Sequence, residues 1–225
     1  TPDARATMVA HMNSLSNAMV NDDGRALLAF ADRDPAARGG AVGCIGYCMS
    51  GPFAFAFAAA EPGRVAAAAS FHGVRLCTDA VDSPHRDAAK IRGELYFGCA
   101  ETDEWAPRAM IDALDAELRQ AGARYRIEWY PGTLHGFVFP QRPAAYHKAA
   151  AERHWERVHA LFARNMFIRP SREELDSFEP DYVILHAPQF HADPAIDGVR
   201  TATAVALSFE KRQIVICGTE YAGEI

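Results

Sequence analysis

The sequence predicts an open, mostly parallel α/β sheet with helices on both faces, followed by a small β-rich fragment with a hairpin. Short apolar runs bounded by turn residues alternate with helical patterns up to about residue 164, which is the pattern of buried parallel strands and their crossover helices. Beyond that point this alternation stops and two β-rich runs follow. At 225 residues and a usual size of about 150 residues per domain, the chain has room for one and a half domains.

The composition is that of a globular chain, with 49% hydrophobic and 23% charged residues and a net charge of −6. It excludes disordered, collagen-like and coiled-coil proteins. Because the basic residues are scattered, no nucleic-acid partner is expected. The longest apolar run, residues 53–60, is far shorter than the roughly 18 residues of a membrane span, so no membrane partner is expected.

Cysteine usage favours a reducing cytoplasm. The chain has an odd number of cysteines without zinc-site spacing, and its first residues lack the pattern of a secretory signal. The cysteines are Cys44, Cys48, Cys77, Cys99 and Cys217.

The elements of the α/β part follow from apolar periodicity and from helix start and stop signals. Pro52 suits the first turn of a helix, and Glu61-Pro62-Gly63 ends that helix. A polar segment containing Pro84 predicts a loop or lid. In order, the predicted elements are one or two helices within 1–40, a strand at 41–46, a helix at 52–60, a strand at 65–71, a loop or lid at 77–89, a strand at 94–98, a helix at 107–120, a strand at 124–130 and a helix at 143–164.

The remaining residues predict less regular structure. A capped short helix is expected from Ser171. Residues 203–209 and 213–217 predict a hairpin with a short turn. His186 and His191 are five positions apart, do not share a helical face and suggest no metal site.

The hexapeptide at residues 46–51, GYCMSG, directly follows the first predicted strand and has the form of a nucleophile elbow. Gly46 and Ser50 supply the small residues that such a tight turn needs. Cys48 would lie at the positive end of the following helix, which favours the thiolate, and the Met49 backbone N–H would be an oxyanion donor. The alternative is a buried structural cysteine in a glycine-rich turn.

An acid and a histidine follow in the order that an α/β-hydrolase requires. Asp103 comes after the third predicted strand and His135 after the fourth, at the edge where open α/β sheets build their sites. Cys48 would attack a carbonyl, His135 would move the proton, and Asp103 would orient the imidazole. Alternatively, Asp103 is a helix cap and His135 an ordinary loop residue.

Residues from about 20 to 163 resemble the dienelactone hydrolase family of the α/β-hydrolase fold. The matching segments are residues 46–51, Ser70-Phe71-His72-Gly73, Asp103 with Pro107, and His135-Gly136-Phe137. The resemblance implies a Cys48, Asp103 and His135 triad, a structural His72, and hydrolysis of lactones and related esters without metal or organic cofactor.

Three departures from the family qualify this. The chain starts too late for the family's first strands, which carry the second oxyanion donor and a glutamate that contacts the cysteine. Ser50 stands where glycine is common. Phe139 stands where some members have an arginine that binds the substrate carboxylate, which argues against dienelactone itself.

Residues from about 161 onward resemble the N-terminal domain of ATP-dependent phosphoenolpyruvate carboxykinases. Tyr221 matches a substrate-contacting tyrosine, but the metal-binding lysine of the family falls beyond residue 225, and the phosphate-binding Gly-x-x-x-x-Gly-Lys-Ser/Thr loop is not in the sequence. Carboxykinase activity is therefore not expected. The matching segments are residues 161–170, 179–181, 186–188, 192–198 and 218–224.

The sequence thus predicts a partial hydrolase domain at 1–163 and a carboxykinase-like fragment at 164–225. The leading hypothesis is a cysteine-dependent hydrolase of a small ester or lactone, with its activity reduced by the missing strands. The alternatives are a catalytically inactive binding or structural chain and, third, carboxykinase-like nucleotide binding. The two resemblances meet near residue 161. This junction has three explanations: a chimera of two genes, an error in assembling the sequence, or a lineage-specific extension.

Limited proteolysis tests the predicted division. A strand left unpaired at its edge needs a cover, and the C-terminal hairpin is expected to pack poorly against the hydrolase part. We expect a protease to release a stable fragment ending near residue 165, identified by mass spectrometry. A single resistant unit of 225 residues would contradict the division.

Overall fold

The computed structural model describes residues 2–35, 37 and 39–166, and four short strands in the rest of the chain. The chain divides into two compact units, Thr1–Leu161 and Phe162–Ile225. In the first unit, four parallel strands are arranged in the order β1-β2-β3-β4. This confirms the predicted class of sheet. The strands are β1 (Val42–Tyr47), β2 (Val65–Phe71), β3 (Glu94–Thr102) and β4 (Arg124–Leu134).

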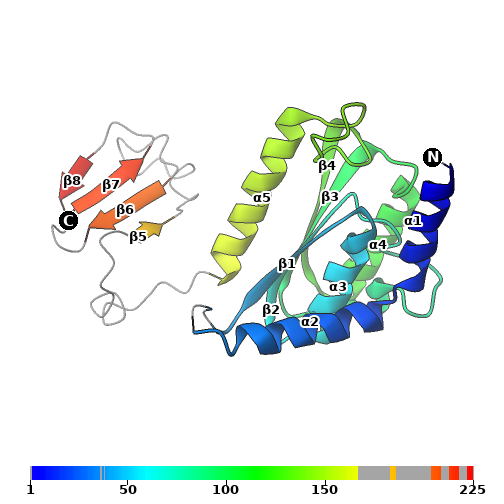
Figure 1. Cartoon of the computed structure of the whole chain (residues 1–225), viewed down its shortest axis with the longest axis horizontal. Helices are drawn as coiled ribbons and strands as arrows, with labels where there is room; N and C mark the ends of the chain where they lie inside the picture. The colour runs from blue at the N-terminus through cyan, green and yellow to red at the C-terminus, as the bar shows by residue number, and fades with distance from the viewer. Residues whose placement is uncertain are drawn as a thin grey trace. The chain divides into compact units, whose positions relative to one another are not determined.

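Helices cover both faces of this sheet (Figure 1), as predicted: α5 lies on one face, and α3 and α4 lie on the other. Helix α2 begins after Ser16, whose hydroxyl accepts a hydrogen bond from the Met19 N–H and so caps the first turn. The helices are α1 (Pro2–Ser14), α2 (Asn17–Ala31), α3 (Gly51–Ala60), α4 (Arg108–Gln120) and α5 (Lys148–Met166), with 3₁₀ turns η1 (Cys48–Ser50) and η2 (Pro84–Lys90).

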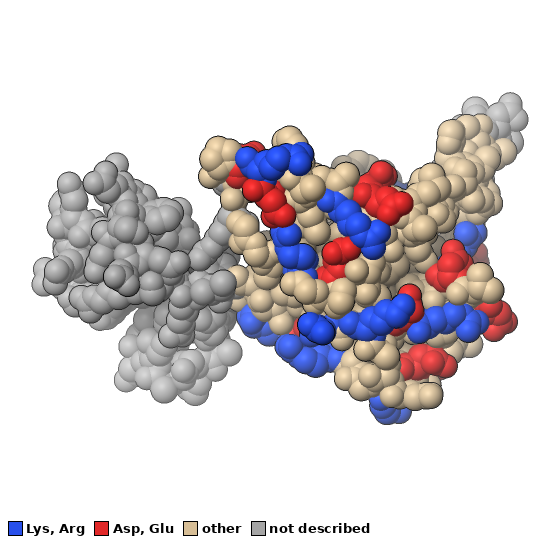
Figure 2. Space-filling model, turned by 90° about the horizontal axis from the view of Figure 1, so that it is seen from below, with Lys and Arg blue, Asp and Glu red and all other residues tan. Residues whose placement is uncertain are grey.

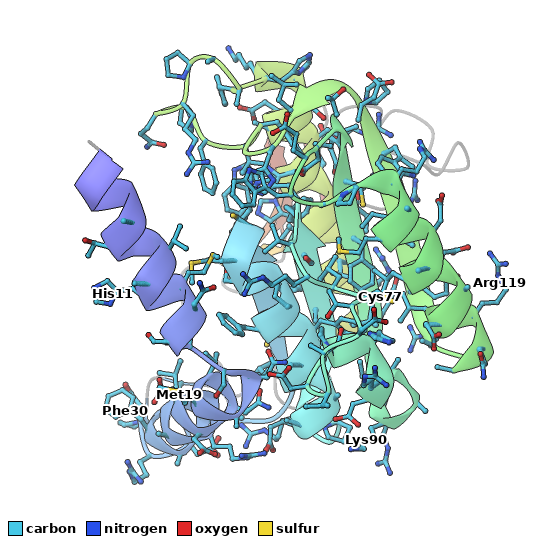
Figure 3. The ribbon with its side chains drawn as sticks, turned by 90° about the vertical axis from the view of Figure 1, so that its right-hand side faces the viewer. His11, Met19, Phe30, Cys77, Lys90 and Arg119 are labelled. Carbon is cyan, nitrogen blue, oxygen red and sulfur yellow. The ribbon has the colours of Figure 1, made fainter. Side chains whose placement is uncertain are left out.

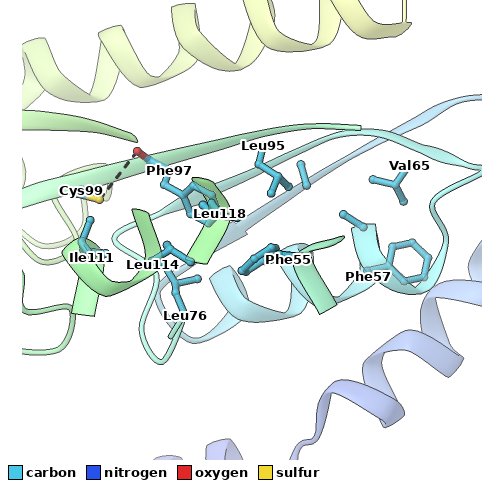
Figure 4. Packing of buried hydrophobic residues seen from close by; sticks show 13 residues of the cluster. Phe55, Phe57, Val65, Leu76, Leu95, Phe97, Cys99, Ile111, Leu114 and Leu118 are labelled. Atoms are coloured by element: carbon cyan, nitrogen blue, oxygen red, sulfur yellow. Dashed lines mark hydrogen bonds between the residues drawn. The ribbon is translucent and has the colours of Figure 1, made fainter. Parts of the chain in front are cut away.

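The main hydrophobic cluster lies between the sheet and helices α3 and α4 (Figure 4). Phe55 of α3 meets Phe97 of β3 edge to face, with ring centroids 5.4 Å apart. Leu114 and Leu118 of α4 are fully buried because they fall on one face of an amphipathic helix. Each such side chain contributes about 1.5–3 kcal/mol, so this layer holds the strand ends in fixed positions.

On the opposite face, a buried carboxylate joins β4 to α5. Glu128 of β4 forms ion pairs with Arg153 and Arg157 of α5, at 2.5 and 2.9 Å. Burial opposes ionisation of Glu128, but its arginine partners outweigh burial and hold its pKa below the usual value. Helix α5 is therefore fixed to the sheet by charge as well as by packing.

Several elements differ from the sequence prediction. Strands β3 and β4 run four residues further than predicted, to Thr102 and Leu134. The predicted loop at 77–89 contains η2. Helix α5 begins at Lys148 rather than residue 143, because backbone hydrogen bonds fold the preceding residues into turns, including one from the His147 N–H to the Phe137 carbonyl.

The second unit contains an antiparallel sheet in the order β5-β6-β7-β8. The predicted hairpin is confirmed as β6 and β7, which pair antiparallel. The predicted helix from Ser171, as well as His186, His191 and Tyr221, lie outside the described residues. The strands are β5 (Val183–Leu185), β6 (Ala204–Ser208), β7 (Gln213–Cys217) and β8 (Ala222–Glu224).

Charged residues of both signs are interspersed on the face of the first unit that Figure 2 shows. Two cross-element ion pairs attach the region of α2 to the rest of the unit: Arg25 with Glu61 at 2.6 Å, and Arg64 with Asp32 at 2.8 Å. Within the described part of the chain, no helix has the length and apolar character needed to cross a bilayer.

Candidate active site

The turn between β1 and α3 holds Cys48 in a conformation that few residues other than glycine adopt. Its φ is +53°, in the left-handed region where a side chain is strained. Gly46 makes the turn possible, because a Cβ at this position would lie 2.1 Å from the Ser50 carbonyl oxygen. The turn therefore projects Cys48 from the carboxyl end of β1.

Ser50 closes the same turn through its hydroxyl group. The Ser50 oxygen accepts a hydrogen bond from the Tyr47 N–H at 2.7 Å and donates one to the Tyr47 carbonyl at 2.9 Å. The sequence predicts only that Ser50 is small enough for the turn. Its hydroxyl additionally satisfies backbone groups at the end of β1, which the glycine common at this position cannot do.

The structure brings Cys48, His135 and Asp103 together from three separate loops. The His135 Nε2 atom lies 3.1 Å from the Cys48 sulfur. The Nδ1 atom of the same ring lies 2.8 and 3.0 Å from the two Asp103 carboxylate oxygens. The three side chains thus form a continuous hydrogen-bonded chain from thiol to carboxylate.

Asp103 is fixed in place by its own loop. Its side chain is 1% exposed, and one carboxylate oxygen accepts hydrogen bonds from the backbone N–H groups of Trp105 and Ala106. These bonds close a turn ahead of α4, whose N-cap is Pro107 and has no side-chain cap, so the helix-cap alternative for Asp103 is wrong. The same carboxylate binds His135.

Cys48 and His135 shift each other's pKa values in opposite directions. Burial opposes ionisation of the Cys48 thiol, but the hydrogen bond and charge of His135 outweigh burial, and the pKa of Cys48 falls below its usual value. The Met49 backbone N–H contributes in the same direction. For His135, burial lowers the pKa, yet its bonds to Asp103 and Cys48 dominate and raise it to about 9.

His72 lies directly beside this chain of groups. Its ring centroid is 4.8 Å from that of His135, and it is 1% exposed. Neither of its ring nitrogens has a hydrogen-bond partner among the described residues. Burial and the nearby charge of His135 lower the pKa of His72 to about 3, so the ring is neutral and acts as packing against His135.

Arg142 is a residue of this site that the sequence did not indicate. Burial raises the pKa of Cys48, and His135 and the Met49 N–H lower it. The guanidinium charge of Arg142 also lowers it, by a smaller amount. Arg142 reaches the site because the loop after His135 folds back, with the Arg142 N–H donating to the Phe139 carbonyl at 3.0 Å. Seven positions separate Arg142 from His135, and no spacing rule connects them. In the described part of the chain, no group of three His, Cys, Asp or Glu side chains is placed to hold a metal ion.

Comparison with known proteins gives two matches along the chain. The dienelactone hydrolase family model matches residues 1–166, and a phosphoenolpyruvate carboxykinase model matches residues 144–225. The two matched ranges overlap over residues that include all of α5.

Solved structures similar to this chain are hydrolases. A putative dienelactone hydrolase from Klebsiella pneumoniae has a TM-score of 0.62 at 24% identity, covering 68% of this chain and 63% of its own. A dienelactone hydrolase-like promiscuous phosphotriesterase from metagenomic libraries has a TM-score of 0.60 at 20% identity, covering 71% of this chain and 66% of its own. At these identities the likeness establishes the fold.

The curated relatives match the other end of the chain. The ATP-dependent phosphoenolpyruvate carboxykinase of Geobacter metallireducens is 50% identical over 78 residues, which is 35% of this chain and 14% of the relative. The glycosomal enzyme of Trypanosoma brucei brucei is 60% identical over 68 residues, which is 30% of this chain and 14% of the relative. The chain therefore spans about one seventh of the length of these carboxykinases.

Gly46→Ala tests the backbone requirement of the β1–α3 turn. A methyl group placed 2.1 Å from a backbone oxygen forces the turn to move, and we expect a loss of about 2–4 kcal/mol in the free energy of unfolding. Gly63→Ala is the matched control, because a Cβ there meets nothing within 4 Å. Urea unfolding of both variants measures the difference, and equal stabilities would contradict the steric argument.

Thiol alkylation tests the ionisation of Cys48. At pH 7, iodoacetamide should label Cys48 at least tenfold faster than Cys77, because the pKa of Cys48 is lowered whereas burial raises that of Cys77. His135→Gln should slow the labelling about tenfold and move its pH dependence up toward the ordinary thiol pKa of about 8.5.

His11→Gln is the control for that measurement, since His11 is an exposed histidine on α1. Labelled peptides are quantified by mass spectrometry as a function of time and pH. If Cys48 and Cys77 react at the same rate, the proposed ionisation of Cys48 is wrong.

Proposed function

The chain belongs, through residues 1–166, to the dienelactone hydrolase family, and we propose that it hydrolyses a small carboxylic ester or lactone with Cys48 as nucleophile. The observation that carries the proposal is the hydrogen-bonded chain from Cys48 through His135 to Asp103. Acyl transfer needs a nucleophile, a base and an acid that orients the base, all in contact. Here the three groups meet at the carboxyl ends of three parallel strands.

In the proposed acylation step, the Cys48 thiolate attacks the carbonyl carbon of the ester. The Met49 backbone N–H follows the nucleophile in sequence, where an oxyanion donor belongs, and it stabilises the negative charge that develops on the carbonyl oxygen. The imidazolium of His135 then donates its Nε2 proton to the departing alkoxide. The products of this step are an alcohol and a thioester on Cys48.

In the proposed deacylation step, neutral His135 removes a proton from water, and the resulting hydroxide attacks the thioester carbonyl. The Cys48 thiolate leaves, the carboxylic acid is released, and the ion pair with His135 is restored. Asp103 holds the imidazole with Nε2 toward the sulfur throughout, because its two oxygens bind Nδ1. Over the two steps, His135 gives one proton to the alkoxide and takes one from water, so no further acid or base is needed.

We place this chemistry in a reducing cytoplasm. The four cysteines whose side chains the structure describes are all free thiols, which a reducing compartment maintains. A nucleophilic thiolate also needs this protection from oxidation.

For residues 164–225 we propose a carboxykinase-derived fragment without carboxykinase activity. The similarity to carboxykinases supports the origin of the fragment. The 225 residues contain no phosphate-binding loop of the Gly-x-x-x-x-Gly-Lys-Ser/Thr type, the element that cradles nucleotide phosphates. The hydrolase proposal therefore concerns residues 1–163 alone.

Turnover of p-nitrophenyl acetate tests the hydrolase proposal. We expect a burst of about one equivalent of nitrophenolate as the thioester forms, followed by slower turnover. Cys48→Ala should lower kcat by about 10³-fold or more, as loss of a nucleophile does in triad enzymes. Cys77→Ala, which removes another half-buried thiol, should retain the wild-type rate. Equal rates for the wild type and Cys48→Ala would contradict the proposal that Cys48 is the nucleophile.

A further inference from the structure

A cavity of about 150 Å³ lies beside the turn that carries Cys48. It is bordered by α1, by the start of α3 and by the loop after β2, and it is partly open to solvent. Figure 3 shows α1 alongside the start of α3, with His11 on the side of α1 that points away from it. The apolar part of the wall is formed by Met12, Leu15, Met49, Pro52, Phe53 and Val74.

Two residues of the cavity wall, Val74 and Met49, are bonded to Cys48. Val74 donates a backbone hydrogen bond to the Cys48 carbonyl at 3.2 Å, and Met49 is the next residue after Cys48. The residue that carries the proposed oxyanion donor therefore contributes to the cavity wall, whereas the side chains of Cys48, Asp103 and His135 do not line it. The hydrolase proposal gives the cavity no role.

Several polar groups at the cavity have hydrogen-bond partners within the chain. The Ser83 hydroxyl accepts a hydrogen bond from the Thr78 N–H at 3.0 Å and contacts His85 Nδ1 at 2.9 Å. The Arg75 guanidinium donates to the Asn13 side chain at 3.0 Å. The exposed side chains of Arg75 and Asp82 also line the cavity, and apolar side chains make up the larger part of the wall.

Two hydrogen bonds hold the corner between α1 and α2 over the cavity. One is the bond from Arg75 to Asn13 of α1. The other runs from the Asn17 side-chain amide, at the start of α2, to the Asp82 carbonyl at 2.6 Å. Both join the helical corner to the loop that follows β2, so the wall made by Met12 and Leu15 keeps its position.

We propose that this cavity binds the acyl group of the substrate, and that this group is uncharged and apolar, either a short aliphatic chain or a single phenyl ring. The inference rests on the proposed hydrolase function. Cavities of about 150 Å³ with apolar walls accept benzene in other proteins, which sets the size. The departing alkoxide must face His135 to receive its proton, whereas the carbonyl oxygen faces the backbone N–H of Met49, which lines the cavity; this assigns the cavity to the acyl side.

A series of p-nitrophenyl esters tests the size and polarity of the acyl group. Each buried methylene group adds about 0.8 kcal/mol, so kcat/KM should rise about tenfold from acetate to butyrate. Benzoate should be accepted, and decanoate should fall below butyrate because its chain exceeds the cavity. All these esters share one leaving group, so differences between them report on the acyl side.

Two neighbouring substitutions make a matched pair. Ala80 lines the cavity, and Ala80→Phe should fill it and reduce the preference for butyrate over acetate to about twofold or less. Val81 is 93% exposed and does not line this cavity, so Val81→Phe should keep the tenfold preference. Turnover of acetate by Val81→Phe serves as the reference for folding and for the Cys48 chemistry.

The two proposals fail in different ways. If acetate is hydrolysed through Cys48 but all chain lengths react alike, the acyl pocket is overturned and the hydrolase stands. If no ester is turned over, the hydrolase proposal fails, and alkylation of Cys48 still tests the pocket: iodoacetanilide should outpace iodoacetamide in wild type and in Val81→Phe, but not in Ala80→Phe. Equal ratios in the two variants would overturn the pocket.

Discussion

The left-handed backbone at Cys48 is the constraint on which the site depends. A positive φ at a residue with a side chain is unfavourable, and here it exists because Gly46 leaves room for the Ser50 carbonyl and the Ser50 hydroxyl ties both polar groups of Tyr47. Strand β1 before Cys48 and helix α3 after it keep the backbone in this conformation. It aims the sulfur at His135 instead of into the core, where the thiol would be inert.

Contrast with the other thiols shows what this placement achieves. Cys44 lies in β1, four residues before Cys48, and burial raises its pKa to about 11. Cys99 lies in β3, and burial chiefly raises its pKa to about 12. Burial also opposes ionisation at Cys48, so the difference between the three thiols comes from the hydrogen bond and charge of His135. Position within the fold, more than residue type, decides which cysteine is reactive.

The sequence was sufficient to place the strands and the three loops of the site because both depend on local patterns. Apolar runs marked the strands, and strand ends marked where Asp103 and His135 would meet Cys48. Arg142 and the wall from α1 could not be found in this way. Arg142 reaches the site only because turns between residues 139 and 147 delay the start of α5. Met12 and Val74 line the same cavity only because α1, far from Val74 in sequence, packs beside it.

The sheet position of the nucleophile raises the question of what holds it rigid. Within the described residues, β1 is an edge strand that pairs with β2 alone, and edge strands are usually the less constrained ones. Three contacts outside the strand pairing compensate. The Tyr47 hydroxyl bonds His154 of α5 at 3.1 Å, the Cys48 carbonyl accepts from Val74, and Ser50 closes the turn. Because these contacts come from three different elements, the direction of the Cys48 side chain does not depend on a second neighbouring strand.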